Sequence, residues 1–475
     1  MSLTTRPAKS LLSTKRLDVL SKVDYVKERM YGINTGWGAS LYEDYLLATN
    51  PSGRFNENGT KFTIQDYFLE FDELITNIRT NGFDSTKSSL PVAQGRIENG
   101  AHRLAVALVK DLIVATHETA SSPQTYDWEY LDKIGLAQVY KDKIALNFIE
   151  ANENIAALLL TGMNQEEVAE ILRRSKSIAD VACTRTISLS EIGKRRLMSL
   201  AYSHNEWWEE KFQETMVYER FREGDQYAQA TALFYVLPPE TSSRALKETL
   251  RSSLSQRTFD RQIHGTDSPK EALLLAQTLL NSNSRHFLNF APVGSENKIL
   301  EKVNALNLPK DGSWAVDGSA TLEMYGVRDA RDVDIVVSKA SSLSGAKLKN
   351  VDRHEREYLN YPASYESIIH DPRSHFYCEG IKFISLGALM QQKIYVSDEK
   401  GILDQKLTSE FLSSTRPLYA IPPKNAPVSL WKLETRVART LEPILRLLPS
   451  WLEGLARRFL KALRIVVESL LRVRT

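Results

Sequence analysis

The chain has little cysteine and no long apolar run. Its 475 residues include only two cysteines, Cys183 and Cys378. They lack the spacing of a zinc site or a disulfide-rich scaffold, which favours a reducing compartment. No run of 18 apolar residues occurs, so we predict no membrane-spanning helix. The first fifteen residues lack the apolar segment of a signal peptide. These absences favour a cytoplasmic protein.

The chain also lacks a strong excess of charge of either sign. Its 61 Lys and Arg residues against 59 Asp and Glu residues give a net charge of +2. Any basic surface must therefore be local, and nucleic acid is not an expected partner. Hydrophobic residues make up 42% of the chain and charged residues 25%, which are ordinary globular values. We expect a multidomain protein of mixed α/β (α+β) class.

Two aspartates, Asp332 and Asp334, stand one residue apart in the apolar run 331–337. A strand directs alternate residues to one face, so the two carboxylates should lie side by side. Two close like charges are costly without a cation between them. Magnesium prefers one or two carboxylates plus phosphate oxygens. The pair therefore predicts a site for Mg²⁺ and a nucleotide; alternatively, the two residues simply end an exposed strand.

Upstream of this pair, a strand-like segment ends in the turn Gly318-Ser319. A glycine lets the backbone approach a phosphate closely, and a helix start after it offers amide donors. The segment from this turn to Asp334 resembles the signature of the nucleotidyltransferase superfamily, over residues 314–407. The resemblance implies that Gly318 and Ser319 bind the phosphates of ATP or another nucleoside triphosphate. It also implies that the two aspartates are catalytic metal ligands.

The family resemblance leaves a third carboxylate and the acceptor to be identified. The segment 381–385 carries no carboxylate, and the sequence does not decide between Glu379 and Asp404 as its substitute. Some members, the LicD and fukutin-like proteins, move phosphorylated groups onto glycans. Residues 375–386, followed by Gln392-Lys393, are similar to proteins of bacterial capsule and surface-polysaccharide loci. This similarity implies a sugar or polyol phosphate as the second substrate.

A second motif, Ile-His-Gly-Thr-Asp-Ser, surrounds His264. It resembles the segment around the phosphorylated histidine of nucleoside diphosphate kinases, although the lysine-bearing first strand of that family is not visible. The resemblance implies that His264 accepts a phosphoryl group and that Arg251 clamps it. A neutral imidazole oriented by a hydrogen bond is competent for this step. The alternative is a strand-to-helix turn with a cap at 267–268 ahead of Pro269.

A third motif runs from Gly95 to Ala107 and contains Gly100, His102 and Arg103. It resembles the ParB/sulfiredoxin-like fold, in which several members bind or cleave nucleotides. The resemblance implies that Gly100 permits close phosphate approach and that His102 and Arg103 contact the phosphates. Alanine replaces the cysteine of sulfiredoxins, which excludes their reductase chemistry. The alternative is a helix start with a solvated histidine and arginine.

The last segment, residues 451–474, has an apolar stripe flanked by arginines and a lysine. A cationic amphipathic helix of this kind suits an anionic membrane surface, on the inner face of the plasma membrane. The alternative is a helix that docks on the protein core or on a partner chain.

These patterns predict six segments along the chain. They are an irregular lead-in (1–55), a ParB/sulfiredoxin-like domain (56–142), a helical connector (143–228), a nucleoside-diphosphate-kinase-like segment (229–308), a nucleotidyltransferase-fold domain (309–415), and a proline-containing linker with the basic helix (416–475). The expected activity is Mg²⁺-dependent phosphoryl or nucleotidyl transfer to a sugar or polyol phosphate in surface-polysaccharide synthesis. Two alternatives are a ParB-like DNA-binding or toxin–antitoxin regulator and a catalytically inactive, membrane-associated scaffold.

Overall fold

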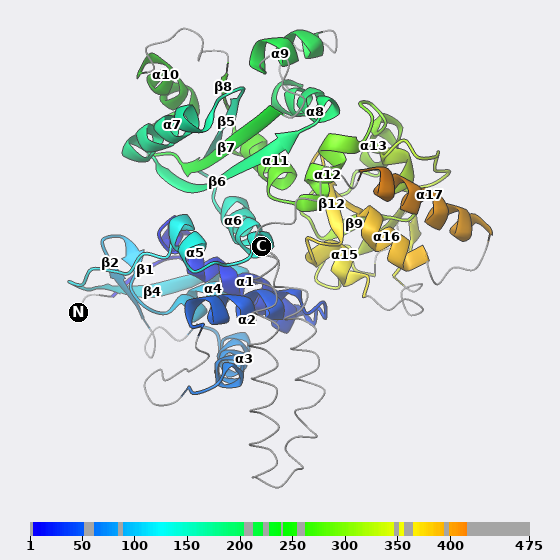
Figure 1. Ribbon diagram of the computed structural model, residues 1–475. Coiled ribbons are helices and arrows are strands. Elements are labelled where there is room, and N and C mark those ends of the chain that lie inside the picture. Colours follow the sequence, from blue (N-terminus) through cyan, green and yellow to red (C-terminus); the bar gives the residue numbers. More distant parts are fainter. Residues whose placement is uncertain are drawn as a thin grey trace, which may run out of the picture. The chain divides into compact units, whose positions relative to one another are not determined.

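The computed structural model describes residues 3–51, 61–83, 89–203, 212–221, 228–238, 241–253, 262–345, 351–355, 364–393 and 399–415. These residues belong to one of two units of the chain, 1–416. They form a mixed α/β fold with three small sheets (Figure 1). Within these ranges, no helix has both the length and the apolar character needed to cross a membrane. The predicted linker and the basic helix 451–474 lie outside the described residues.

The first sheet has the strand order β1-β4-β2-β3. Its strands are β1 (Leu3–Pro7), β2 (Leu90–Ala93), β3 (Arg96–Ile97) and β4 (Ile113–Glu118). The helices of this part are η1 (Ala8–Leu11), η2 (Leu17–Val19), α1 (Leu20–Tyr31), α2 (Trp37–Thr49), α3 (Ile64–Asn81), α4 (Ala101–Val109), α5 (Trp128–Lys133) and α6 (Gln138–Ala151).

The expectation of an irregular lead-in over 1–55 is wrong. This stretch supplies the edge strand β1, which pairs antiparallel with β4, and the helices α1 and α2. Buried side chains of α1 and α2 belong to the same core as those of α4. The polar residues scattered through 1–55 concealed these elements, because tertiary packing rather than local periodicity stabilises them.

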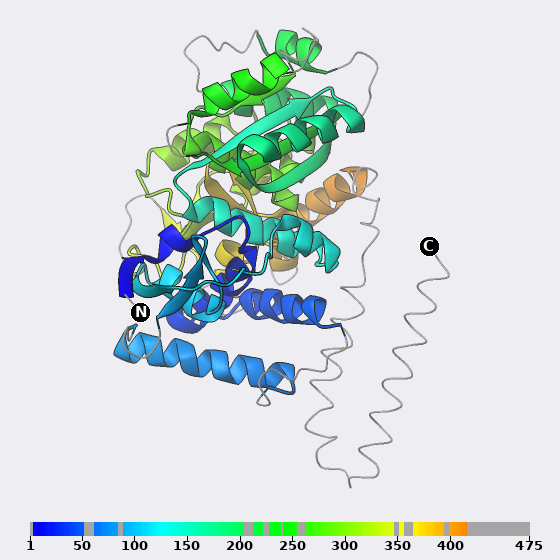
Figure 2. The same ribbon diagram turned by 90° about the vertical axis from the view of Figure 1, so that its left-hand side faces the viewer.

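Local signals place α3 correctly, and Figure 2 shows it as the long light blue helix. Thr63 accepts a hydrogen bond from the Asp66 backbone N–H, and the Asp66 side chain accepts one from the Thr63 N–H, which is a capping box. Gly82 ends the helix with a positive φ of 76°, a conformation that glycine adopts without strain.

The second sheet has the strand order β6-β7-β5-β8, with every neighbouring pair antiparallel. Its elements are β5 (Ile155–Thr161), α7 (Gln165–Ile178), β6 (Asp180–Leu189), α8 (Glu191–Tyr202), α9 (Phe212–Arg220), β7 (Ala228–Val236), α10 (Ser243–Ser253) and β8 (Ile263–Gly265). This succession is the β-α-β-β-α-β arrangement of ferredoxin-like folds, with α8 and α9 joining the middle strands. Helices α7 and α10 pack on one face, and α8 and α11 (Pro269–Leu279) pack on the other (Figure 1).

The expectation of a helical connector over 143–228 is therefore wrong, because β5 and β6 lie within it. The apolar run of β5 is buried at all seven positions. Such a run fits a buried helix and a central strand equally well by periodicity alone. The sheet predicted to begin near 229 accordingly begins at 155.

The third sheet has the strand order β11-β10-β9-β13-β12. Its elements are β9 (Trp314–Asp317), α14 (Ala320–Met324), β10 (Asp334–Val337), β11 (Asp352–Arg353), α15 (Glu366–His370), β12 (His375–Cys378), β13 (Ile381–Ile384), α16 (Leu386–Lys393) and α17 (Glu399–Thr415). Its core includes Phe287 and Ala291, at the end of α12 (Ser282–Phe290), and three residues of α13 (Asn297–Asn304). The core of this part thus starts well before the expected boundary at 309.

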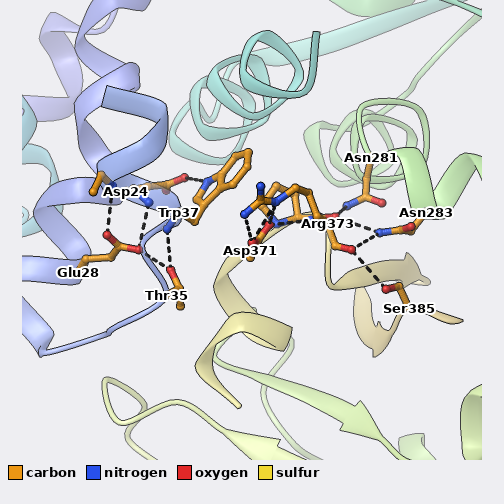
Figure 3. A network of polar contacts seen from close by, with 12 residues as sticks. Asp24, Glu28, Thr35, Trp37, Asn281, Asn283, Asp371, Arg373 and Ser385 are labelled. Atoms are coloured by element: carbon orange, nitrogen blue, oxygen red, sulfur yellow. Dashed lines mark hydrogen bonds and ion pairs between the residues drawn. The ribbon is translucent and has the colours of Figure 1, made fainter. Parts of the chain in front are cut away.

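The loop between α15 and β12 contacts Trp37 of the first part and two residues of α12 (Figure 3). The Arg373 guanidinium lies over the Trp37 ring, 4.9 Å from its centroid, and pairs with Asp371 at 2.5 Å. Asn281 and Asn283 donate to the carbonyl of Pro372. Trp37 comes from the first part, and the two asparagines lie at the start of α12. These contacts link the loop to the first part and to the start of α12.

Candidate functional site

The pairing of β9 with β10 brings two aspartates together at one end of the third sheet. The two strands are antiparallel, and Asp317 stands directly opposite Asp334. Directly opposed residues of an antiparallel pair point to the same face. Asp317 ends β9 and Asp334 begins β10, so both carboxylates lie where the strands leave the sheet. Asp317 is fully buried, and the Asp334 side chain is 14% exposed.

The predicted glycine turn follows Asp317 immediately. Gly318 has a φ of 69°, in the left-handed region. A Cβ placed on it would stand 3.0 Å from Asp334 Oδ2 and 3.8 Å from His354 Cε1. Glycine at this position therefore avoids a close contact between a side chain and the carboxylate. Ser319 is buried and precedes α14, a helix of only five residues.

His354, one residue beyond β11, lies between the two aspartates. Its Nδ1 is 3.0 Å from Asp317 Oδ2, and its Nε2 is 3.5 Å from Asp334 Oδ1. The Gln392 side-chain amide, from α16, donates to the Asp317 carboxylate at 3.2 and 3.4 Å. Asp317 thus accepts from two side chains, which fixes its orientation.

Burial and neighbouring charge act on Asp334. Its pKa lies above the ordinary value, chiefly because burial disfavours the charged form. The nearby carboxylates of Asp332, Asp317 and Asp352 raise the pKa further, while His354 lowers it. Asp332 itself is exposed and lies in a bend before β10 rather than in the strand. Of the two aspartates predicted to share a strand, Asp334 is the first residue of β10 and Asp332 lies outside it.

Neither substitute for the third carboxylate stands in this cluster. Glu379 is exposed in the turn before β13; β13 runs parallel to β9, so this turn lies at the end of the sheet away from Asp317. Asp404 is fully buried, and both its oxygens accept from Arg328, at 2.6 and 2.9 Å. On the side of β10 away from β9 lies β11, in which Asp352 is in register with Asp334.

His264 lies in β8, opposite Leu159 of β5. The Tyr202 ring meets its ring edge-on at 4.6 Å, and the Arg220 guanidinium lies over Tyr202 at 5.2 Å. His264 is 9% exposed. Arg251 is a residue of α10, but its side chain is outside what the structure describes.

The turn after His264 forms the expected cap. Ser268 accepts a hydrogen bond from the Glu271 backbone N–H, and Pro269 occupies the first turn of α11. The backbone after His264 is thus the strand-to-helix turn expected as the alternative to a phosphohistidine site.

His102 points into the core rather than toward solvent. Its Nε2 is 2.7 Å from the Tyr42 hydroxyl, and its ring meets Phe71 edge-on at 4.6 Å. Burial holds the His102 pKa well below the usual histidine value, so the ring is neutral at pH 7. This environment favours a packing role over contact with a phosphate.

Gly100 and Arg103 lie at the start of α4, as expected. Gly100 has a φ of 92°, and a Cβ there would stand 2.6 Å from Leu90 Cδ2 and 3.0 Å from an Arg103 guanidinium nitrogen. Burial lowers the pKa of Arg103. Gly100 thus makes room for the packing of Leu90 and Arg103.

Among the described residues, no group of three or more His, Cys, Asp and Glu side chains is arranged to hold a metal ion. Asp334 Oδ1 and His354 Nε2, 3.5 Å apart, could supply two protein ligands. A cation at this place would complete its shell with water and substrate oxygens, as magnesium commonly does.

Comparisons with known proteins add no relative: no family model, curated protein or solved structure matches the chain. Three residues of the cluster, Asp317, His354 and Gln392, were not among the site residues expected from the sequence. The only signal for Asp317 was its place before the glycine turn. His354 sits in the charged run 352–357, where a solvated face was the simpler interpretation.

Proposed function

We propose that the third sheet carries the active site of a divalent-cation-dependent nucleotidyl or phosphoryl transferase. The observation that carries the proposal is the convergence of Asp317, Asp334 and His354 on the Gly318 turn. This arrangement combines a half-buried carboxylate with a glycine turn whose backbone lies close to it. We place the phosphates of a nucleoside triphosphate against this turn.

The residues of the cluster suit different tasks. Asp334 is the carboxylate available to a cation, since it is partly exposed and its 3.5 Å contact with His354 is longer than the contacts that hold Asp317. A bound divalent cation would neutralise phosphate charge and help orient the displacement. Asp332 and Asp352 add negative charge near Asp334, which attracts the cation and its nucleotide complex.

Asp317 acts through His354 in this proposal. It is fully buried and accepts hydrogen bonds from both His354 and Gln392. A carboxylate so placed orients the imidazole ring and keeps the site in one arrangement. The proposed acceptor, a sugar or polyol phosphate in surface-polysaccharide synthesis, rests on the sequence resemblance alone.

The test is turnover of radiolabelled nucleotides by the full chain with Mg²⁺ or Mn²⁺ and a panel of sugar and polyol phosphates. Nucleotidyl transfer releases pyrophosphate, whereas phosphoryl transfer releases a nucleoside diphosphate, so product analysis separates the two reactions. Turnover must disappear in Asp334→Asn and persist in Asp180→Asn, an exposed aspartate at the start of β6. Failure of the wild type with every nucleotide and both cations contradicts the proposal.

A second candidate function resides in the second sheet, where we propose phosphoryl transfer through His264. The specific observation is that the Arg220 guanidinium lies over the Tyr202 ring, which in turn meets the His264 ring edge-on. The test is acid-labile label on the protein after incubation with γ-labelled ATP. His264→Gln should remove that label, whereas Asp334→Asn should not.

A further inference from the structure

His354 stands at the centre of a chain of polar contacts with a defined direction. Gln392 donates to Asp317, and Asp317 lies 3.0 Å from His354 Nδ1. The buried Asp317 carboxylate accepts a hydrogen bond from Nδ1–H of His354. The other ring nitrogen, Nε2, then faces Asp334. Carboxylates hold metal-binding histidines in this manner, through the ring nitrogen that does not touch the metal.

The spacing between Nε2 and Asp334 fits two neighbouring ligands of one cation. The two atoms are 3.5 Å apart. Two ligands at right angles on bonds of about 2.1 Å lie about 3 Å apart, so a small rotation of either side chain brings both to bonding distance. The imidazole lone pair and the carboxylate repel each other at this range unless a proton or a metal ion lies between them.

The backbone of Gly318 lies close to this pair. The Gly318 hydrogen faces Asp334 Oδ2 and His354 Cε1, where any Cβ would press on the carboxylate at 3.0 Å. Glycine at this position therefore leaves the Asp334 carboxylate undisturbed. The His354 side chain is 18% exposed and that of Asp334 14%, so the pair is in partial contact with solvent.

We infer that His354 Nε2 and Asp334 Oδ1 are the protein's ligands to the cation, with Asp317 and Gln392 as positioning residues. The inference deepens the proposed function, on which it rests, by naming the cation class. A nitrogen ligand adds little affinity for magnesium but favours first-row transition metals. The site therefore prefers a cation such as Mn²⁺ over Mg²⁺.

The test is pulsed electron paramagnetic resonance of Mn²⁺ bound to the full chain, which detects a directly bonded ¹⁴N nucleus. The wild type is expected to give one tightly bound Mn²⁺ with a nitrogen coupling. His354→Gln should lose the coupling and at least about tenfold in Mn²⁺ affinity, while His117→Gln, a histidine of β4 paired with Ser89, should change neither. Gln392→Leu should keep the coupling and weaken binding about tenfold.

The outcomes separate this inference from the proposed function. If Mn²⁺ binds and turnover occurs without a nitrogen coupling, His354 only forms an ion pair with the aspartates; the inference is overturned and the proposed function stands. If no cation binds and no turnover occurs, both fail. Circular dichroism and melting of each variant show whether a loss of binding reflects a loss of fold, and Gln392→Leu supplies a milder second change.

Discussion

Two glycine turns in this chain look alike in sequence and differ in what surrounds them. Gly100 and Gly318 both have positive φ and both precede a helix. A Cβ on Gly100 would meet Leu90 and Arg103, whereas one on Gly318 would meet Asp334 and His354. The first glycine therefore serves packing, and the second lies in an acidic cluster. A glycine just before a helix identifies a turn, and only the neighbours across the fold identify a site.

The two histidines beside these turns sharpen the contrast. His102 is enclosed by Tyr42 and Phe71, and its ring is neutral. His354 touches two carboxylates and is partly exposed. Changes at the two places should therefore act differently, on activity at the third sheet and on stability at the first.

The largest expected effect is on catalysis at the third sheet. Asp334→Asn should lower transfer activity at least about 100-fold, since it removes the charge that holds the cation at the reacting phosphate. Its melting temperature should stay close to that of the wild type, because Asp334 is partly exposed. Steady-state kinetics and thermal melting of the same preparation check this. Wild-type activity in Asp334→Asn would move the active site elsewhere.

The next effect is on stability at the first sheet. His102→Ala should destabilise the fold by about 3 kcal/mol, because it leaves a cavity among aromatic rings and removes the partner of the Tyr42 hydroxyl. Transfer activity of the folded fraction should not change. Urea unfolding followed by circular dichroism measures the loss. A stable His102→Ala protein with weakened nucleotide binding would restore His102 as a phosphate ligand.

The two glycines themselves should separate stability from activity. Gly100→Ala should cost about 2 kcal/mol, because alanine is strained at positive φ and its Cβ would press on Leu90 at 2.6 Å. Gly318→Ala should cost about 1 kcal/mol and reduce activity by displacing the Asp334 carboxylate. Melting curves and transfer activity of the Gly100→Ala and Gly318→Ala variants test this difference. Equal losses of activity in both variants would contradict the contrast.

The smallest effect is a dependence of stability on pH. The folded pKa of His102 lies well below 6.5, so below pH 6.5 the unfolded chain binds a proton that the folded chain does not. His102 therefore contributes stability above pH 6.5 that is lost as the pH falls, at up to about 1.4 kcal/mol per pH unit. His102→Gln should flatten the wild-type curve between pH 6.5 and 5 in urea titrations. Parallel curves would show that His102 is protonated in the folded protein.

Some of the fold was readable from local sequence signals, and some was not. The α3 helix follows from its capping residues and Gly82, and the strand–turn–helix at Gly318 follows from its glycine. The β5 strand was interpreted as helix because a fully buried apolar run carries no period. The elements within 1–55 were missed because their stabilising contacts lie far along the chain, as in the pairing of β1 with β4.

The candidate site was predicted in part for a similar reason. Asp334 and Gly318 belong to one continuous motif, so their spacing could be read. His354 and Gln392 reach Asp317 from 37 and 75 residues away, and no local pattern connects them. Glu379 and Asp404 were considered as the third carboxylate because they follow the motif. Strand order and an ion pair with Arg328 place them elsewhere.

The most direct test of the account is anomalous diffraction from crystals of the full chain grown with Mn²⁺ and a non-hydrolysable nucleoside triphosphate. We expect one strong manganese peak within bonding distance of the Asp334 carboxylate, with the nucleotide phosphates against the Gly318 turn. A nucleotide bound at another place in the chain, with no manganese beside Asp334, would contradict it.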